Sequence, residues 1–283
     1  MNRSRLSKII ITALALPALL LPGACLVYIL FKGLPALSWS FFFSVTEGAG
    51  FAATGGILSP LLGSLLLALA ASLLATPFAL GTALYYRLLA SSRQQRLLAG
   101  LLNMLQSIPP IVFGLFGLIV FVHLWQWGVS LLSGAVILAM VILPMLVLNS
   151  IASLERIPEQ YTEAAESLGL QYGAVIGRVW LVQAWPGILT GQLLGIARAL
   201  SETAPILFTA TVFSGVVWPD SIFSPVTTLQ THIFYLAQEG SNPAVIQIAW
   251  GSAVVLLGLV AAFALLARYL SNRYEKPQRL GAE

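Results

Sequence analysis

The chain has 283 residues, of which 58% are hydrophobic and 8% are charged, with a mean hydropathy of +0.91. Soluble domains carry about 25% charged residues, so this composition excludes an ordinary soluble protein and predicts that most of the chain lies in lipid. The net charge of +4 does not indicate nucleic-acid binding, because no basic cluster alternates with aromatic residues. Cys25 is the only cysteine, which excludes an internal disulfide and a cysteine-based metal site.

Apolar segments predict an all-α, polytopic membrane protein with six spans. The first span, residues 9–31, is too long for the apolar region of a cleaved signal peptide, and Cys25 is expected to be buried in the membrane. Pro109-Pro110 predicts a bend in the third span, because proline removes helical hydrogen bonds. The other five spans are predicted over residues 57–86, 97–124, 131–150, 187–213 and 244–267.

The distribution of positive charge predicts the orientation of these spans. Six spans place both termini on one side of the membrane, together with the segments around residues 87–96 and 159–183. Twelve of the 14 lysines and arginines lie on that side. The positive-inside rule therefore predicts that both termini are cytoplasmic. The twelve are Arg3, Arg5, Lys8, Arg87, Arg93, Arg96, Arg156, Arg178, Arg268, Arg273, Lys276 and Arg279.

A short amphipathic helix is predicted in the segment between the fourth and fifth spans. Pro158 can start it, Glu159 and Glu163 lie toward the positive end of the helix dipole, and Gly169 can end it. An apolar edge suited to a groove on another protein is formed by Ala164, Ala165, Leu168 and Leu170. On spacing alone, an ordinary surface helix between two spans remains an equal alternative.

Arg198 and Glu202 are the charged pair of the predicted fifth span. At 1.5 Å per residue, Arg198 would lie roughly 17 Å from one end of the span and 23 Å from the other. An arginine at that depth costs about 3 kcal/mol or more, so it should face protein, water or an anion. Glu202, four residues later, lies within pairing reach. The pair is either a structural ion pair or a site where Arg198 binds a tetrahedral oxyanion and Glu202 orients the guanidinium.

The segment Glu163-Ala164-Ala165, with Gly169 six residues after the glutamate and Val179 and Leu181 further on, resembles the EAA motif of ABC importer permeases. In that family this loop is a coupling helix that docks on the ATP-binding subunit. The resemblance implies an ATPase-coupling role for Glu163, Ala164, Ala165 and Gly169. Val182 stands where the family usually has a proline, and Pro186 follows, so the turn into the next span is expected to be displaced.

The segment from Arg198 to Pro205, RALSETAP, is similar to the RALGETAP segment of phosphate ABC importer permeases of the PstA family, with Ser201 where glycine is usual. Residues 55–57, 108–114 and 186–191 are also similar, and the likeness covers about residues 55–270. It implies the type I ABC importer permease fold with six core transmembrane helices. It also implies that Arg198, Glu202 and Thr203 lie on the path of phosphate, so that the chain forms half of a translocation pathway.

The resemblance further implies a non-catalytic subunit in a bacterial inner membrane. Its partners would be a homologous second permease (PstC-like), an ATP-binding subunit dimer (PstB-like), an external phosphate-binding protein (PstS-like) and membrane lipid, with no nucleic acid. ATP and Mg²⁺ would be used by the partner ATPase, and no cofactor is expected in this chain. No lysine follows a glycine, as a Walker A loop requires, and His123 and His232 lie far apart without companion metal ligands.

Three domains are expected: an N-terminal helix with an external interfacial loop (residues 1–56), a permease core (57–270) with a coupling loop (151–185), and a basic cytoplasmic tail (271–283). Other functions stay open at this point. The chain could be a permease for molybdate, tungstate or sulfate, or an ion-gradient-driven transporter in which Arg198 and Glu202 form a proton-linked pair. A non-transporting membrane scaffold or sensor is the third alternative.

Overall fold

The computed structural model describes residues 3–47, 54–212, 218–238 and 242–280, and these ranges are almost entirely helical. A short antiparallel ribbon pairs β1 (Thr46–Glu47) with β2 (Thr54–Gly55). The α-helices are α1 (Arg3–Gly33), α2 (Trp39–Phe43), α3 (Leu58–Leu88), α4 (Ser92–Ser107), α5 (Pro110–Gly117), α6 (Leu131–Glu155), α7 (Glu159–Ser167), α8 (Tyr172–Val175), α9 (Leu181–Ser201), α10 (Ala204–Thr209), α11 (Leu229–Gln238) and α12 (Pro243–Leu280). Shorter segments are a 3-10 turn (Leu34–Ala36) and two π-helical segments (Leu118–Leu124 and Ile176–Trp180).

The number of spans agrees with the prediction. Within the described residues, five helices are long and apolar enough to cross a membrane, and a broken helix pair brings the number to six. The five are Ile11–Ala36, Leu58–Leu88, Leu131–Glu155, Tyr172–Ser201 and Pro243–Tyr274. The chain is therefore an all-α, multi-pass membrane protein.

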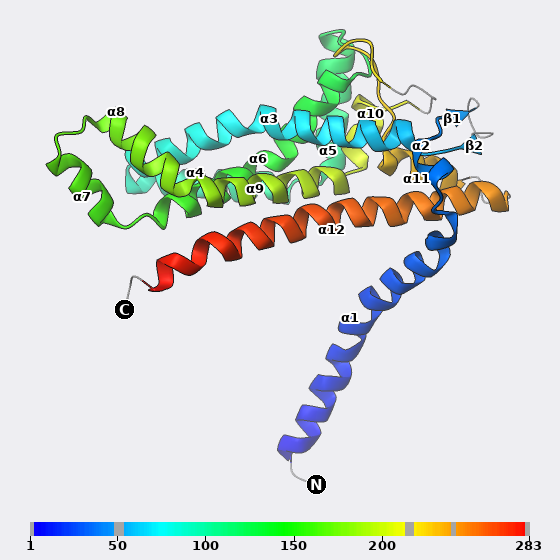
Figure 1. Cartoon of the computed structure of the whole chain (residues 1–283), viewed down its shortest axis with the longest axis horizontal. Helices are drawn as coiled ribbons and strands as arrows, with labels where there is room; N and C mark the ends of the chain where they lie inside the picture. The colour runs from blue at the N-terminus through cyan, green and yellow to red at the C-terminus, as the bar shows by residue number, and fades with distance from the viewer. Residues whose placement is uncertain (1–2, 48–53, 213–217, 239–241, 281–283) are drawn as a thin grey trace.

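The core of the molecule is a bundle in which α3, α6 and α9 pack on one another and α12 lies along α9 (Figure 1). Small residues permit this packing, because they let helix backbones approach closely. Close contact matters in a membrane, where the hydrophobic effect does not drive helices together. The buried stripe of α3 consists of Ala68, Ala71, Ala75, Ala79 and Ala83, each at most 1% exposed.

Three glycines spaced four residues apart form the face of α9 that packs on α6. A Cβ on Gly191 would lie 2.9 Å from the Cβ of Asn149, and a Cβ on Gly195 would lie 2.8 Å from Cδ2 of Leu146. Gly187 meets Ser153 in the same way. Because such distances leave no room for a side chain, glycine is required for α9 and α6 to pack this closely.

Helix α1 leaves the bundle and extends away from it, as Figure 1 shows. It contacts α12 near its C-terminal end, where Tyr28 packs edge-on against Trp250 at 5.5 Å. The apolar window of this span has no residue buried within the chain. Cys25 is accordingly exposed on the surface of this chain, and its burial in the membrane stays a prediction. Among the described residues, no other helix covers this part of α1.

The third span is broken into two helices at the proline pair. The axes of Ser92–Ser107 and Pro110–Leu124 differ by 86°, which is a much sharper bend than a proline kink within a continuous helix. Ile108 and Pro109 both have extended ψ angles, 125° and 133°. Each of them precedes a proline, and the ring of a following proline disfavours the helical conformation. The predicted bend is thus confirmed and is a complete break.

The fifth span differs from the prediction. Helix runs from Tyr172 to Ser201, ends there, and resumes as α10 at Ala204. The span therefore lies about 15 residues earlier than residues 187–213, by comparison of the two starting residues, and Arg198 is in its last turn rather than near its middle. Pro186 lies inside α9, so no turn occurs there. The helix continues upstream of α9 through the π-helical segment and α8. The span therefore begins at Tyr172, inside the predicted loop.

Two segments predicted as loop or tail contain helix. Helix α11 lies within residues 215–243 and packs on α12 and α3. His232 on this helix is buried, with 5% exposure. Helix α12 continues to Leu280, through most of the residues assigned to the basic tail.

Candidate functional site

The ion pair predicted between Arg198 and Glu202 is present. The Nη2 atom of Arg198 lies 3.1 Å from Oε1 of Glu202, and the two side chains are 49% and 13% exposed. Glu202 is the residue that ends α9: its backbone is extended (ψ 126°) and its N–H donates to the carbonyl of Ala199. Thr203 follows as the residue that precedes α10, and its carbonyl accepts from the N–H of Leu207 at 3.2 Å. The three predicted translocation residues therefore meet at a helix break.

The break after α9 lies against the helix that follows the break in the third span. Helices α5 and α10 pack on each other, and a Cβ on Gly114 would lie 2.8 Å from the Cα of Pro205. Pro205 also fixes the start of α10, because proline suits the first turn of a helix, where its missing N–H is not needed. Non-helical backbone at membrane depth is tolerated where protein or water satisfies it, and such breaks mark the substrate sites of many transporters.

A buried polar network fixes the end of α9. The side-chain amide of Gln230 donates to the carbonyl of Leu200 at 2.6 Å, and its Oε1 accepts from the hydroxyl of Ser64 at 3.0 Å. The same hydroxyl oxygen accepts from the N–H of Leu229 at 2.8 Å. Carbonyls in the last turn of a helix lack intrahelical partners, so Gln230 supplies the bond that α9 lacks at Leu200. These residues were not identified from the sequence, because their separations of 30 and 166 residues give no local signal.

The predicted amphipathic helix is α7, and Gly169 ends it as expected. The N–H of Gly169 donates to the carbonyl of Glu166 at 2.9 Å, and the N–H of Leu170 donates to that of Ala165 at 3.1 Å. These two bonds form a Schellman motif, which needs a left-handed residue after the helix. Gly169 has a φ of +76°, a value that other residues rarely adopt.

The predicted apolar edge of α7 is divided between two faces. Ala165 is 5% exposed and Leu170 packs on the core cluster, so both face the chain itself. Leu168 is 83% exposed, and Ala164 and Glu163 are also exposed. The expectation of a single edge is wrong, because the Schellman turn reverses the chain and carries Leu170 inward. The outward face available to a partner consists of Glu163, Ala164 and Leu168, with Tyr161 at its edge.

Trp180 connects α7 to the bundle. Its indole Nε1 donates to the hydroxyl of Thr162 at 3.0 Å, and its ring packs edge-on against Tyr172 at 6.4 Å. The guanidinium of Arg87, in the last turn of α3, lies 4.3 Å from the centre of the Trp180 ring. Arginine over an indole is a favourable cation–π arrangement. Sequence reasoning placed Arg87 only as a topology signal and did not identify Trp180.

The two groups of predicted residues lie at opposite ends of α9. From Leu181 to Ser201 the helix has 21 residues, which is about 30 Å at 1.5 Å per residue. The outward face of α7 and the Arg198–Glu202 pair are therefore separated by the length of α9, with α8 and the π-helical segment between α7 and α9. Among the described residues, no three His, Cys, Asp or Glu side chains lie close enough together to hold a metal ion.

Comparison with protein families gives one match over the greater part of the chain. Residues 75–276 match the family described as the binding-protein-dependent transport system inner membrane component. The matched range includes α7 and the Arg198–Glu202 pair.

Individual relatives cover nearly the whole chain. It is 31% identical to the probable ABC transporter permease protein YqgI of Bacillus subtilis, over 88% of both chains. It is 34% identical to the phosphate transport system permease protein PstA of Xylella fastidiosa, over 87% of this chain and 84% of the relative. It is 32% identical to the probable phosphate transport system permease protein PstA of Methanocaldococcus jannaschii, over 95% and 94% of the two chains.

Solved ABC importers share the fold. A chain of a bacterial alginate ABC transporter superposes with a TM-score of 0.61 at 16% identity, covering 95% of this chain and 98% of that one. A chain of the MetNI methionine ABC transporter, in an inward-facing conformation, gives a TM-score of 0.60 at 16% identity, covering 77% and 95%. The arrangement of helices is therefore that of an ABC importer permease.

Proposed function

Because the chain belongs to the family of binding-protein-dependent transport system inner membrane components, we propose that it is a permease subunit of an ATP-driven phosphate importer and forms half of the translocation pathway. Two relatives that cover most of the chain are named phosphate transport permeases. The observation that carries the proposal is the half-exposed guanidinium of Arg198, held by Glu202 at a helix break. It is a charge at a membrane helix end that remains open to an anion.

Arg198 suits a tetrahedral oxyanion because its planar guanidinium offers several N–H donors in a fixed fork. Glu202 restrains that fork from one side and lowers the net charge of the site, so that phosphate is held weakly enough to leave. Thr203, at the same break, supplies a hydroxyl beside the pair.

The proposed orientation places α7 in the cytoplasm. In Figure 1, α7 lies at the same end of the bundle as the C-terminal end of α12, the end of α3 and the start of α4. Exposed arginines of the predicted cytoplasmic side come from these segments and from the π-helical segment that follows α8, among them Arg93, Arg96 and Arg178. The opposite end carries Lys32. This asymmetry supports cytoplasmic termini in a bacterial inner membrane.

The surfaces left open on this chain suit the proposed partners. The outward face of α7 is available to an ATP-binding subunit dimer (PstB-like), which would use ATP and Mg²⁺, while this chain itself is non-catalytic. The uncovered apolar sides of α1, α4 and α5 are available to lipid and to a second permease (PstC-like). The end of the bundle near α2 would receive a phosphate-binding protein (PstS-like).

Coupling follows from the connection between the two sites. A movement of α7 caused by ATP binding on the partner is transmitted through Trp180 and α9 to the Arg198–Glu202 pair. Transport requires that the permease has two conformations. The docked loop and the substrate must each favour one of them by a difference in free energy.

The test is uptake of labelled phosphate into proteoliposomes that contain the complete complex, with binding protein outside and ATP inside. We expect ATP-dependent uptake that resists excess sulfate and molybdate. Uptake should fall roughly tenfold or more in Arg198→Ala, the loss expected for a charged hydrogen bond of about 1.5–3 kcal/mol. Arg96→Ala, an exposed arginine on α4, is the matched control and should transport normally.

Each alternative predicts a different result in that assay. Inhibition by molybdate, tungstate or sulfate at equal concentration would assign another oxyanion. Uptake driven by an imposed proton gradient without ATP would assign an ion-gradient-driven transporter. Normal uptake by Arg198→Ala would leave the transporter in place and make the pair structural.

A further inference from the structure

The last helix, α12, continues beyond the part of it that can lie in lipid. Residues 243–267 contain no charged side chain, and at 1.5 Å per residue this segment spans about 37 Å. That length is enough to cross a hydrocarbon core of about 30 Å. The helix nevertheless runs on to Leu280. The part that starts at Arg268, residues 268–280, therefore extends past the hydrocarbon core, and we call it the basic extension.

The basic extension has a net charge of +3, because it contains four basic residues and one acidic residue, Glu275. The basic residues are Arg268, Arg273, Lys276 and Arg279. Arg268 and Arg273 are exposed, and neither has an ion-pair partner among the residues that the structure describes. The charges of these two arginines are therefore open to a partner outside the chain.

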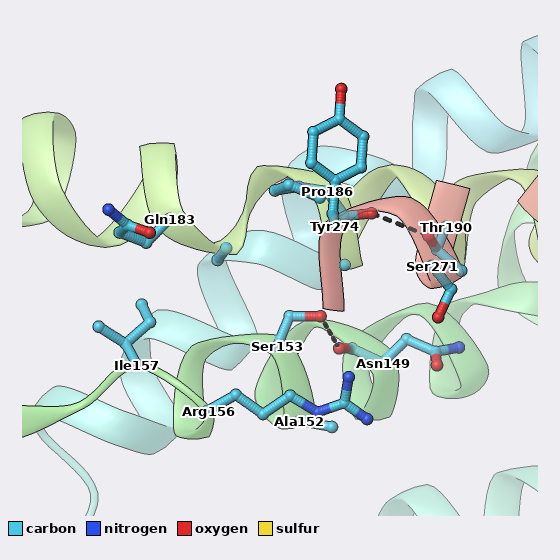
Figure 2. Close-up of a pocket in the computed structure, with 12 residues that line it drawn as sticks. Asn149, Ala152, Ser153, Arg156, Ile157, Gln183, Pro186, Thr190, Ser271 and Tyr274 are labelled. Atoms are coloured by element: carbon cyan, nitrogen blue, oxygen red, sulfur yellow. Dashed lines mark hydrogen bonds between the residues drawn. The ribbon is translucent and has the colours of Figure 1, made fainter. Parts of the chain in front are cut away.

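One side of this end of α12 packs on the bundle. Ala267 is 1% exposed, and Ser271 and Tyr274, four and seven residues later, line a polar pocket of about 170 Å³ (Figure 2). The pocket lies between α12, the first half of α9 and the end of α6 next to Arg156. Residues with this spacing lie on one side of a helix. The two exposed arginines do not line the pocket, so they belong to the other sides of α12.

The exposed side of α12 changes from apolar to aromatic to basic along the chain. Leu265 and Leu266 are 65% and 47% exposed, and Tyr269 is 59% exposed. Only 11% of the apolar window of this span is buried within the chain, so the exposed leucines suit contact with lipid. Tyrosine at the end of a span is typical of the boundary between lipid and water. The exposed arginines therefore begin at the level of the lipid head groups.

We propose that the basic extension of α12 binds the head groups of anionic lipids. Two observations identify lipid as the partner: the charge is complementary to an anionic membrane surface, and the extension continues the side of α12 that faces lipid. Clusters of four or more basic residues directly after a transmembrane helix attract anionic lipids in this way. The assignment to the cytoplasmic leaflet rests on the orientation given under the proposed function, whereas the binding itself does not.

The test places a spin label on the basic extension in the assembled complex, whose other subunits are made free of cysteine. Cys25→Ser removes the only cysteine of this chain, and Asn272→Cys introduces one at an exposed, uncharged position of α12. The complex in lipid-free detergent is titrated with phosphatidylglycerol or with phosphatidylcholine, and the mobility of the label is measured by electron paramagnetic resonance. We expect phosphatidylglycerol alone to immobilise the label saturably, and salt at about 0.5 M to reverse the effect by screening.

Arg268→Gln combined with Arg273→Gln should raise the half-saturating concentration of phosphatidylglycerol about thirtyfold, which corresponds to about 1 kcal/mol for each arginine. The matched control is Arg268→Lys combined with Arg273→Lys, which keeps both charges and should bind like the native chain. A label at Ser167, an exposed residue of α7, is the second control. It should respond to neither lipid, because α7 is not part of the basic extension.

The proposal is overturned if phosphatidylcholine immobilises the label as well as phosphatidylglycerol does, or if the loss of both arginines leaves the half-saturating concentration unchanged. An equal response at Ser167 would indicate a general effect of lipid on the complex and would also overturn it. So would a label at residue 272 that is immobile before lipid is added, because a protein surface would then cover the extension. Binding is measured here without ATP or transport. Its failure therefore leaves the proposed importer standing, and a failed uptake assay leaves the binding result valid.

Discussion

Trp180 and Thr162 are joined by a hydrogen bond of 3.0 Å from the indole Nε1 to the threonine hydroxyl. The same indole ring also contacts Arg87, whose guanidinium carbon lies 4.3 Å from the ring centre. One side chain thus joins α7, the segment that leads into α9, and the last turn of α3. Trp180 is 6% exposed, so the contact is protected from water.

The first prediction concerns this contact. Trp180→Phe removes the N–H and keeps an aromatic ring for Arg87, so it should cost about 1 kcal/mol, the usual value of one hydrogen bond. We expect uptake of phosphate to fall several-fold, with membrane insertion unchanged. ATP hydrolysis should fall less than uptake, because α7 remains docked but transmits its movement poorly.

A double-mutant cycle in thermal unfolding tests whether the bond itself is responsible. Thr162→Val should cost a similar amount, and combining it with Trp180→Phe should add little, since both changes remove the same interaction. Trp185→Phe is the control, because Trp185 is 59% exposed. Fully additive costs would assign the effect of Trp180 to packing alone.

The second prediction concerns Gly169. A Cβ there would meet nothing within 4 Å, so a substitution is opposed only by the φ of +76°. Gly169→Ala should cost about 1–2 kcal/mol, Gly169→Asn less, and Gly169→Val more, because β-branched side chains resist the left-handed region. Capture of the ATP-binding subunits by the permease should weaken in the same order.

Gly173→Ala is the matched control for that series. Gly173 also has open space around it, but its backbone does not have a positive φ. It should bind the ATP-binding subunits normally. Equal effects of alanine at the two positions would show that the left-handed conformation of Gly169 is not what the coupling helix needs.

The third prediction concerns the contact of α9 with α6. Gly191→Ala places a Cβ 2.9 Å from that of Asn149, so the helices must separate, and we expect a loss of about 1–3 kcal/mol in unfolding free energy. Gly81→Ala on α3 meets nothing within 4 Å and should be neutral or stabilising by up to about 1 kcal/mol. Thermal unfolding in lipid nanodiscs compares the two, and equal melting temperatures would contradict the close packing.

The fourth prediction concerns the network at the end of α9. Gln230→Leu leaves the carbonyl of Leu200 and the hydroxyl of Ser64 without this partner in a buried site, which should cost about 1–3 kcal/mol. Uptake should fall as well, because Glu202 follows this turn directly. Gln238→Leu on the same helix is the control, since Gln238 is exposed. Indistinguishable unfolding curves for the two variants would show that the network does not hold α9.

Much of the architecture was predictable because membrane proteins encode it locally. Apolar length gave six spans, and the bend at Pro109-Pro110 follows from the chemistry of proline. The limits of α7 were also predictable, since Pro158 and Gly169 act on their immediate neighbours. The four-residue spacing of Arg198 and Glu202 was enough to predict that they pair.

The place where the fifth span ends was not predictable from its apolar residues. The segment after Ser201 is as hydrophobic as the helix before it, so hydropathy gave no boundary. The structure places the break at Glu202 and Thr203, where Gln230 supplies the missing bond to the carbonyl of Leu200 and where α10 packs on Gly114. A charge predicted in mid-span is consequently at a helix end.

The sequence by itself determined the number of spans, the limits of α7, and the pairing of Arg198 with Glu202, because these depend on residues close together in the chain. Only the tertiary structure decided that Trp180 connects Thr162 to Arg87, that α7 has two faces, and that a polar pocket forms beside Arg156. Those features join residues far apart in the chain. Their positions depend on how closely α3, α6, α9 and α12 pack, and that packing brings together small residues from helices that are far apart in the chain.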